Sequence, residues 1–369
     1  MSRPHIKPEH MPFRISGGRI RIGGMTYGLA AEINDPDGFV WTLLEGMDGN
    51  HSLDEIVALA ARMHPGIALE ILRQAASQLQ DSGYVEDAGA PDPPVLTSRD
   101  KERYDRARRY YRWLDLISRV STWEPQALLA AAKVTVLGVG GNGGVASLAL
   151  AAAGVGRVHC VDPDVVELSN LSRQVLYAEA DIGAPKAEAA VRRLRALNSD
   201  IVITGERLRV SSADDAAGLA SGCDVLLMAA DEPADARIWV NRACIAAGRP
   251  WVDVGYYGPL VQASVYVPGE GGCWECLHDN VREPLLELGI VPDDARQVEH
   301  LAPRMRSAVG TVPAGISGYL SAHLVIALLT GIPPVRPGTV QVINLAALDA
   351  PYTSAGPARP DCPACGGEP

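Results

Sequence analysis

The sequence lacks a run of apolar residues long enough to cross a bilayer. Its longest such run, from about Ala322 to Leu329, is much shorter than the roughly 20 residues that a transmembrane helix needs. The N-terminal residues are polar and include Pro and His, where a secretory signal would have an apolar core. We therefore expect a soluble, cytoplasmic protein with no membrane partner.

An excess of positive charge is also absent. The formal net charge of -11 at pH 7 argues against nucleic acid as a partner. A local basic run from Lys101 to Arg112 is the exception, although the solvent-facing side of a helix has the same composition. The 47% hydrophobic content excludes a largely disordered chain, and 369 residues suffice for one large α/β domain and a smaller one.

Residues 1–88 predict a small α+β domain. Residues 14–33 have the pattern of short strands, and Gly17 and Gly18 can adopt the positive φ angles of a tight hairpin turn. Three helices are expected next. Asp35 is the predicted N-cap of the first helix, and a capping box at Ser52 begins the second.

This order of elements, together with the segment LLEGMDGNHSLDEIVAL, resembles a winged-helix-like leader-recognition domain related to the pyrroloquinoline-quinone chaperone. Domains of that family occur in enzymes that modify ribosomally made peptides. The resemblance implies that an extended leader peptide binds as an added strand at a sheet edge. A structural or dimerisation role for a generic winged helix stays open, whereas DNA binding is disfavoured because the third helix offers mainly Arg73 as a cation.

Residues 89–98 are rich in proline and predict an extended linker to a second domain, residues 99–369. From Lys133 onward, strand and helix patterns alternate as in βαβ units, which predicts a doubly wound, Rossmann-like sheet. A ligand is expected at the carboxyl ends of its strands. The expected strands are 134–137, 158–161, 225–228, 251–254 and 264–267, and the expected helices are 143–153, 186–197 and 314–329.

A glycine-rich loop follows the first strand of this domain and precedes a helix, so its backbone N–H groups can approach a phosphate. Asp162 closes the second strand. These two features suit NAD as well as ATP, because an acidic residue at that place can hold ribose hydroxyls in either case. The glycines concerned are Gly138, Gly140, Gly141 and Gly143.

The residues that follow favour ATP. A triphosphate that loses pyrophosphate needs cations on its developing charge, and Arg173 and Lys186 can supply them. The whole pattern, GxGGxG…DxDxVxxSNLxRQ…GxxK, resembles the E1-like activating enzymes of the ThiF type. That family includes the activators of the molybdopterin and thiamin sulfur carriers and of ubiquitin.

The resemblance implies a role for each matching residue. Asp162 would hold the ribose, Gln174 would lie in the nucleotide region, and Asp231 would bind Mg²⁺ beside the α-phosphate. Asp231 can also be interpreted as a strand-end cap. The residues expected to hold the phosphates are Asn170, Arg173 and Lys186.

Residues 102–106 are similar to a segment of E1-like enzymes that contributes an arginine side chain to the active site of the partner subunit. Arg106 is the candidate for this arginine, which would make it catalytic together with Arg173, Lys186 and Asp231. The assignment implies a homodimer. The alternative is that Arg106 lies on a solvated helix face.

Four of the seven cysteines form two CxxC pairs, which is the ligand set of a tetrahedral, structural Zn²⁺ site. A thioredoxin-like redox pair is disfavoured, because one pair would be enough for that chemistry. The predicted zinc ligands are Cys273, Cys276, Cys362 and Cys365, and the predicted core cysteines are Cys160, Cys223 and Cys244.

Residues 277–361 contain no cysteine. E1-like enzymes that form a thioester or persulfide carry one in this segment, so we expect no covalent capture of the substrate on the enzyme. The adenylate would instead be attacked directly by a nucleophile of a substrate or partner. Residues 278–313 are polar and are interpreted as a loop over the active site. Its His278, His300 and Arg304 are candidates to contact a peptide substrate, and the alternative is that they are solvated loop residues.

The leading hypothesis is an ATP-dependent adenylyltransferase that activates a carboxylate or carboxamide of a ribosomally made precursor peptide bound through its leader. The combination of domains resembles the enzymes that mature microcin C7 and pantocin. Two alternatives remain: activation of the C-terminus of a β-grasp sulfur carrier, and non-catalytic presentation of a leader to a cyclodehydratase. The retention of Asp162, Arg173, Lys186 and Asp231 disfavours the last.

Overall fold

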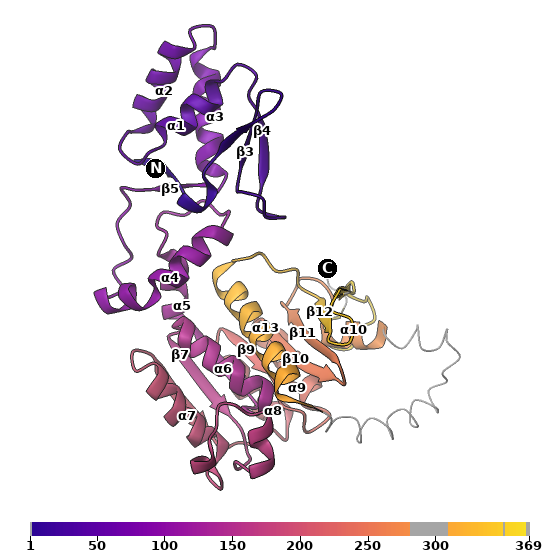
Figure 1. Cartoon of the computed structure of the whole chain (residues 1–369). Coiled ribbons are helices and arrows are strands. Elements are labelled where there is room, and N and C mark those ends of the chain that lie inside the picture. Colours follow the sequence, from indigo (N-terminus) through magenta and orange to yellow (C-terminus); the bar gives the residue numbers. More distant parts are fainter. Residues whose placement is uncertain (1, 281–308, 350, 367–369) are drawn as a thin grey trace. The chain divides into compact units, whose positions relative to one another are not determined.

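The computed structural model describes residues 2–280, 309–349 and 351–366. The chain forms two compact units, which meet between Leu128 and Leu129 (Figure 1). The first unit contains two small sheets and the first four helices, and the second contains one large sheet with its covering helices.

The predicted hairpin in the first unit is formed by β2 and β3. Gly17 and Gly18 have φ angles of 78° and 65°, as expected for the turn between its two strands. A three-stranded antiparallel sheet has the order β2-β3-β4, and a second sheet pairs β1 with β5. The strands are β1 Pro4–Ile6, β2 Phe13–Ile15, β3 Arg19–Ile22, β4 Ala31–Asn34 and β5 Val85–Asp87, and the helices are α1 Phe39–Gly46, α2 Leu53–Met63 and α3 Leu69–Asp81.

The helix starts were predicted in part. The capping box at Ser52 is confirmed, since its hydroxyl accepts from the backbone N–H of Glu55 and the Glu55 side chain accepts from that of Ser52. The predicted start at Asp35 is wrong, because Gly38, with φ at 76°, precedes α1. The Asp35 carboxylate still accepts from the first turn of α1, with 3.0 and 2.9 Å to the backbone N atoms of Val40 and Trp41.

The three-stranded sheet has one apolar and one charged face. Ile20 and Ile22 of β3 are buried in the core of the first unit. The alternate residues Arg19 and Arg21 lie on the other face, where both pair with Glu32 of β4 at 2.6 and 3.0 Å. The alternation fixes the register, since a slip by one residue would bury charge. The helices supply the rest of the core with Leu43, Leu44, Met47, Ile56, Leu72 and Ala76.

Helix α4, Ser98–Leu114, lies in the first unit, and α5, Glu124–Ala131, spans the boundary. Arg112 of α4 pairs with Glu9 at 2.6 Å and with Glu86 at 3.4 Å, and all three side chains are largely buried. Nearby, Lys7 Nζ donates to the carbonyl of Asp115 at 2.6 Å. These contacts join α4 and the residue that follows it to the segment after β1 and to β5, at the two ends of residues 1–88. The domain limits 1–88, 89–98 and 99–369 stay a prediction.

Replacing Arg112 with alanine should lower the free energy of unfolding of the first unit by about 3–5 kcal/mol, because two buried carboxylates would lose their shared cation. Urea unfolding followed by circular dichroism would measure the change. Arg109→Ala is the matched control on the same helix, since Arg109 is 62% exposed and its pair with Asp105 should contribute under about 1 kcal/mol. Equal effects of the two changes would contradict the prediction.

The second unit has an eight-stranded sheet in the order β13-β12-β11-β10-β9-β6-β7-β8. The five strands β10, β9, β6, β7 and β8 are parallel to one another, and the pairs β10–β11, β11–β12 and β12–β13 are antiparallel. The predicted α/β, Rossmann-like fold class is confirmed. The strands are β6 Lys133–Leu137, β7 Arg157–Val161, β8 Val202–Glu206, β9 Val225–Met228, β10 Trp251–Tyr257, β11 Leu260–Tyr266, β12 Thr339–Asn344 and β13 Tyr352–Ala355.

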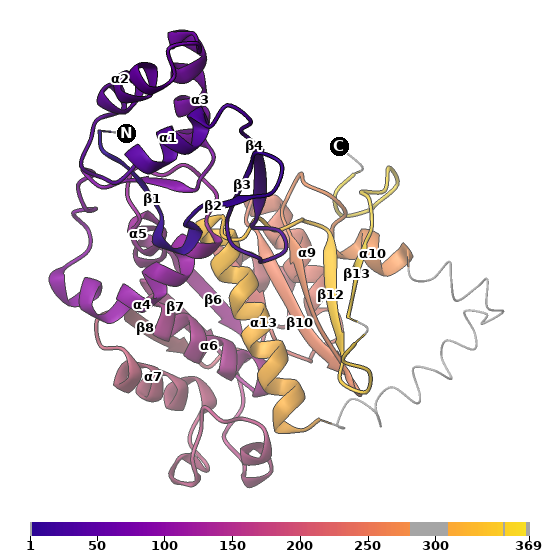
Figure 2. The ribbon, with the colours of Figure 1, turned by 45° about the horizontal axis from the view of Figure 1, so that its top comes forward.

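Helices cover both faces of this sheet. On one face, α6 packs against α7 and α13, and on the other α8 packs against α9 (Figures 1 and 2). This is the doubly wound arrangement, since the helices that follow β6 and β7 cover one face and those that follow β8 and β9 cover the other. The helices are α6 Gly141–Ala153, α7 Lys186–Leu197, α8 Ala213–Ser221, α9 Ala236–Ala247, α10 Trp274–Asn280 and α13 Thr311–Thr330.

Helix α13 is longer than the apolar run in the sequence suggested. By length and composition alone, it could cross a membrane. Its contacts are those of a core helix, because it packs against α6, β10 and β11, and the Ser317 hydroxyl donates to Asn142 Oδ1 at 3.0 Å. The start at Thr311 and the end of α10 at Asn280 shorten the predicted loop 278–313. Its residues 281–308, including His300 and Arg304, lie outside the described residues.

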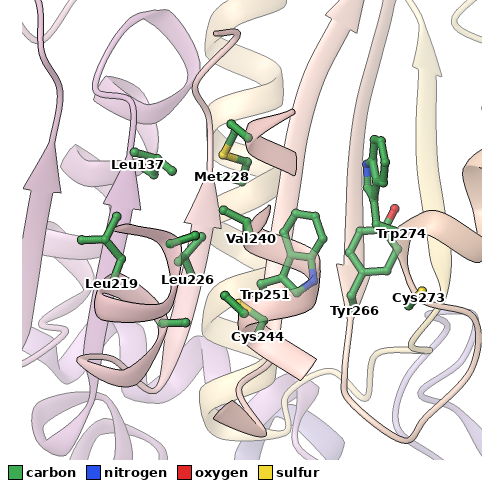
Figure 3. Close-up of a cluster of buried hydrophobic side chains, with 14 of the residues drawn as sticks. Leu137, Leu219, Leu226, Met228, Val240, Cys244, Trp251, Tyr266, Cys273 and Trp274 are labelled. Carbon is green, nitrogen blue, oxygen red and sulfur yellow. The ribbon is translucent and has the colours of Figure 1, made fainter. Parts of the chain in front are cut away.

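The core beneath α8 and α9 continues to the four paired cysteines. Trp251 of β10 and Tyr266 of β11 are opposite each other in register, with ring centroids 4.7 Å apart. Figure 3 shows their side chains beside Trp274 and Cys273, in the same cluster as Leu226 and Val240. The predicted core cysteines Cys160, Cys223 and Cys244 are all buried.

Candidate active site

A cavity of about 350 Å³ lies at the carboxyl ends of the parallel strands β6, β7 and β9. This is where a doubly wound sheet binds its ligand. Residues from eight separate segments of the chain line it. The predicted site residues among them are Gly138, Gly140, Gly141, Asp162, Arg173, Gln174, Lys186 and Asp231.

The glycine loop joins β6 to α6. Gly138 has a φ of 88°, which only glycine adopts readily. A Cβ atom at Gly143 would overlap the carbonyl oxygen of Gly138, so glycine is needed there for the helix to approach the loop. Gly143 itself does not line the cavity. Gly140 and Gly141 do, at the N-terminus of α6, where free N–H groups and the helix dipole favour an anion.

Asp162 anchors this loop from the end of β7. Its carboxylate accepts from the backbone N of Val139 at 2.9 Å and from that of Asp164 at 3.0 Å. Each oxygen keeps a second lone pair, which could accept from a ribose hydroxyl. Tyr177 supports the same loop, because its hydroxyl donates to the Val139 carbonyl at 2.8 Å. Burial raises the pKa of Tyr177, so it stays a donor at neutral pH.

Lys186 is the first residue of α7, and its side chain is largely buried at the cavity wall. Its Nζ lies 3.2 Å from Asp164 Oδ2, and Arg209 Nη2 lies 3.4 Å from Asp164 Oδ1. Both cations line the cavity. Together with the N-termini of α6 and α7, they make this side of the cavity suited to a polyanion.

The segment before α7 places Arg173 and Gln174 at the cavity. Arg173 Nη1 donates to the Ser169 carbonyl at 3.3 Å. The Gln174 side chain is buried, and its Oε1 has no hydrogen-bond partner among the described residues. Asn170 is not among the residues that line the cavity. Its Oδ1 accepts from the backbone N of Glu167 at 3.1 Å, within the turn that precedes Arg173. The predicted phosphate contact from Asn170 stays a prediction.

Asp231 follows β9, the strand that pairs with β6, and it is exposed and lines the cavity. Tyr256 of β10 lines the cavity as well, and burial, aided by the charge of Asp231, raises the pKa of its hydroxyl. Arg237 of α9 is fixed by Asp253 at 2.9 Å, whose charge raises the pKa of the guanidinium. An exposed carboxylate such as Asp231 could bind Mg²⁺ with phosphate and water as further ligands.

Arg106 lies on α4 in the first unit, whereas all residues that line the cavity belong to the second. Its catalytic role and the homodimer that the role implies stay predictions. No site role was predicted for Asp164, although it is the second acidic residue of the DxDxV motif. Arg209 was missed because β8, which precedes it, was not predicted. Other lining residues that were not predicted include Asn142, Leu208, Val210, Tyr256 and Ala314.

The four paired cysteines come together at the edge of the second unit, with all four Sγ atoms within 4.8 Å of one another. Cys273 Sγ is 3.7 Å from Cys276 and 3.6 Å from Cys362, and Cys276 is 3.5 Å from Cys365. Zinc–sulfur bonds of about 2.3 Å in a tetrahedron place sulfur atoms roughly 3.8 Å apart. The residues therefore fit Zn²⁺. The backbone N of Arg359 donates to Cys276 Sγ at 3.3 Å, as second-sphere donors do at such sites.

Comparison with known proteins decides the family. Residues 112–364 match the ThiF family, which is more than half of the chain. The chain belongs to the ThiF family. The SAMP-activating enzyme E1 of Haloferax volcanii is 35% identical over 246 residues, which cover 66% of this chain and 83% of the relative. The sulfur carrier protein adenylyltransferase of Thermus thermophilus is 35% identical over 275 residues, 73% of this chain and 93% of the relative.

These relatives support the predicted class of activity, an ATP-dependent adenylyltransferase. Some relatives are longer: the chain spans 56% of the length of the mouse adenylyltransferase and sulfurtransferase MOCS3. Among solved structures, Escherichia coli MccB has the same fold, with a TM-score of 0.77 and 23% identity. The match covers 99% of this chain and 97% of MccB, and MccB has also been solved with ATP and with MccA.

Proposed function

We propose that this ThiF-family chain uses ATP to adenylylate a carboxylate or carboxamide of a ribosomally made precursor peptide, which it binds through the leader of that peptide. The observation that carries the proposal is the cavity, where a glycine loop, Arg173, Lys186 and Asp162 converge at one end of the sheet. Loop N–H groups and the two cations would stabilise charge as the substrate oxygen attacks the α-phosphorus and pyrophosphate leaves.

Magnesium would act beside them. Asp231 would hold Mg²⁺, which when bound would neutralise phosphate charge. Asp162, already fixed by two backbone N–H groups, would orient the ribose, and Gln174 would border the phosphates beside Gly140. Arg106 of a second copy would supply a further cation in a homodimer.

The peptide part of the proposal rests on the first unit. Its residues 1–111 lie outside the ThiF match. Among the residues that the structure describes, β2 and β4 pair only with β3, so each has a free edge. An extended peptide can add to such an edge through main-chain hydrogen bonds. Exposed apolar side chains near these edges could give selectivity: Met11 and Phe13 just before and on β2, and Met25 and Tyr27 in the loop between β3 and β4.

The likeness to MccB favours a peptide substrate as well, since it extends over the first unit, and MccB has been solved with the peptide MccA. The best alternative is activation of a sulfur carrier protein, which the relative from Thermus thermophilus favours by its name. That alternative leaves residues 1–111 without a role.

ATP–pyrophosphate exchange tests the proposal. The full-length chain would be incubated with radiolabelled pyrophosphate, ATP and Mg²⁺, together with a precursor peptide encoded beside it, the same peptide without its leader, or one with a scrambled leader. We expect exchange with the intact precursor to exceed that with either altered peptide by at least about tenfold. Exchange with a β-grasp protein alone would select the sulfur-carrier alternative. Leader binding without any exchange would identify a presentation protein.

A further inference from the structure

Asp164 stands between two cations at the wall of the cavity. Its carboxylate accepts from Lys186 Nζ on one oxygen and from Arg209 Nη2 on the other, at 3.2 and 3.4 Å. All three residues line the cavity. No other carboxylate of the described chain has an ion pair with Lys186, so Asp164 decides where that ammonium group points.

The backbone fixes this pair. Residues 164–166 and 183–186 run antiparallel as a short ladder, in which the Lys186 N–H donates to the Asp164 carbonyl at 2.9 Å. The Val166 N–H donates to Ala184 at 2.9 Å, and the Gly183 N–H donates to Val166 at 2.8 Å. The main-chain hydrogen bonds therefore hold residues 164 and 186 side by side, and at this backbone position the two side chains reach each other at 3.2 Å.

Arg209 reaches the same carboxylate from a different segment. It follows β8, between Leu208 and Val210, which pack on the core beneath α8 and also line the cavity. Its guanidinium lies 3.4 Å from Asp164 and 4.0 Å from Glu232, so it spans the cavity rim between the segments that follow β7 and β9. A guanidinium has five N–H donors, so Arg209 can keep Asp164 and still donate to an anion in the cavity.

We propose that Asp164 is a positioning residue that holds Lys186 in the geometry needed during adenylylation, and that Arg209 orients Asp164 while adding positive charge for ATP. The proposal rests on the proposed use of ATP. It goes beyond that use by giving Asp164 and Arg209 opposite effects on the positive charge of the cavity. Asp164 lowers the positive charge of the empty cavity but fixes the direction of Lys186. Arg209 raises the positive charge.

The kinetic consequences have opposite signs. Asp164→Asn keeps the shape of the side chain and removes a negative charge next to two cations, so the KM for ATP should stay equal or fall. Its kcat should fall by about 10–100-fold, because Lys186 would lose the orientation it needs in the transition state. Arg209→Gln removes a positive charge, so the KM for ATP should rise about tenfold. Arg209→Lys keeps the charge and should therefore raise the KM for ATP by a smaller factor.

The experiment is steady-state ATP–pyrophosphate exchange with the intact precursor, combined with calorimetric binding of the analogue AMPCPP, for wild type and each variant. Arg207→Gln is the matched control, since Arg207 is in the same segment but donates to the Pro163 carbonyl and does not line the cavity. Thermal unfolding and zinc content should not change, because the side chains of Asp164 and Arg209 are 51% and 57% exposed.

The outcomes separate this inference from the proposed function. A lower kcat without a higher KM for Asp164→Asn, with a higher KM for Arg209→Gln, supports the inference. Wild-type kinetics in both variants would overturn it. It would also be overturned if kcat and the affinity for ATP fell together in both variants and in proportion to a loss of folded protein. If wild type neither binds AMPCPP nor catalyses exchange, the proposed use of ATP itself is wrong.

Discussion

Replacing Lys186 with alanine is expected to lower the rate of ATP–pyrophosphate exchange by about 10²–10³-fold, the usual cost of removing one preorganised group that stabilises transition-state charge. Lys186 is buried at the wall of the cavity and begins α7, so an ammonium group from elsewhere cannot easily replace it. Exchange would be measured at saturating peptide over a range of ATP concentrations.

The fold should survive this change. The partner left behind, Asp164, is half-exposed and keeps its contact with Arg209, so no buried charge is left unpaired. Arg192→Ala is the matched control, because Arg192 lies on the same helix, is 54% exposed and pairs with Asp181 away from the cavity. Full exchange activity in Lys186→Ala would show that the phosphates are bound elsewhere.

Loss of the zinc site should have the largest effect on stability. In Cys276→Ser, we expect zinc content to fall from one equivalent to near zero and Tm to drop by at least about 10 °C, because binding energy on the order of 10 kcal/mol is coupled to folding at such sites. The thiol of Cys276 is fully buried among the other three cysteines. Zinc would be measured by atomic absorption and Tm by calorimetry.

Cys244→Ser is the matched control for this change. Cys244 is as fully buried as Cys276, but it lies in α9 and is not one of the four clustered cysteines. Its substitution should cost stability and leave the zinc content at one equivalent. A Cys276→Ser protein that keeps its metal and its Tm would contradict the structural role of the site. Slow removal of zinc from wild type by a strong chelator should reproduce the loss of stability.

Local sequence patterns predicted the elements that depend on local chemistry. The hairpin at Gly17 and Gly18 needs two residues with positive φ, and the start of α2 needs the capping pair that Ser52 and Glu55 provide. The start of α1 was missed because Gly38 delays it, although Asp35 still caps the helix from a distance. Moving the first residue of a helix by a few positions changes few contacts, so the sequence pattern says little about where the helix begins.

The candidate site was predictable where its residues belong to one short motif. The segments from Gly138 to Gly143 and from Asp162 to Lys186 are each next to a strand end or a helix start, so the fold class was enough to bring them together. Arg209 could not be found in this way. It reaches Asp164 only because β8 pairs with β7, and β8 has too little apolar patterning to predict as a strand.

The sequence by itself predicted the family, the Rossmann-like class and the position of the nucleotide motif, because these depend on residue type and short spacing. The tertiary structure decided the rest. It brought cysteines 89 residues apart to within bonding distance of one metal, assigned α4 to the first unit through Arg112, and placed Arg209 on the carboxylate that holds Lys186. Each of these contacts joins segments that are distant along the chain, and only packing of the whole core fixes such distances.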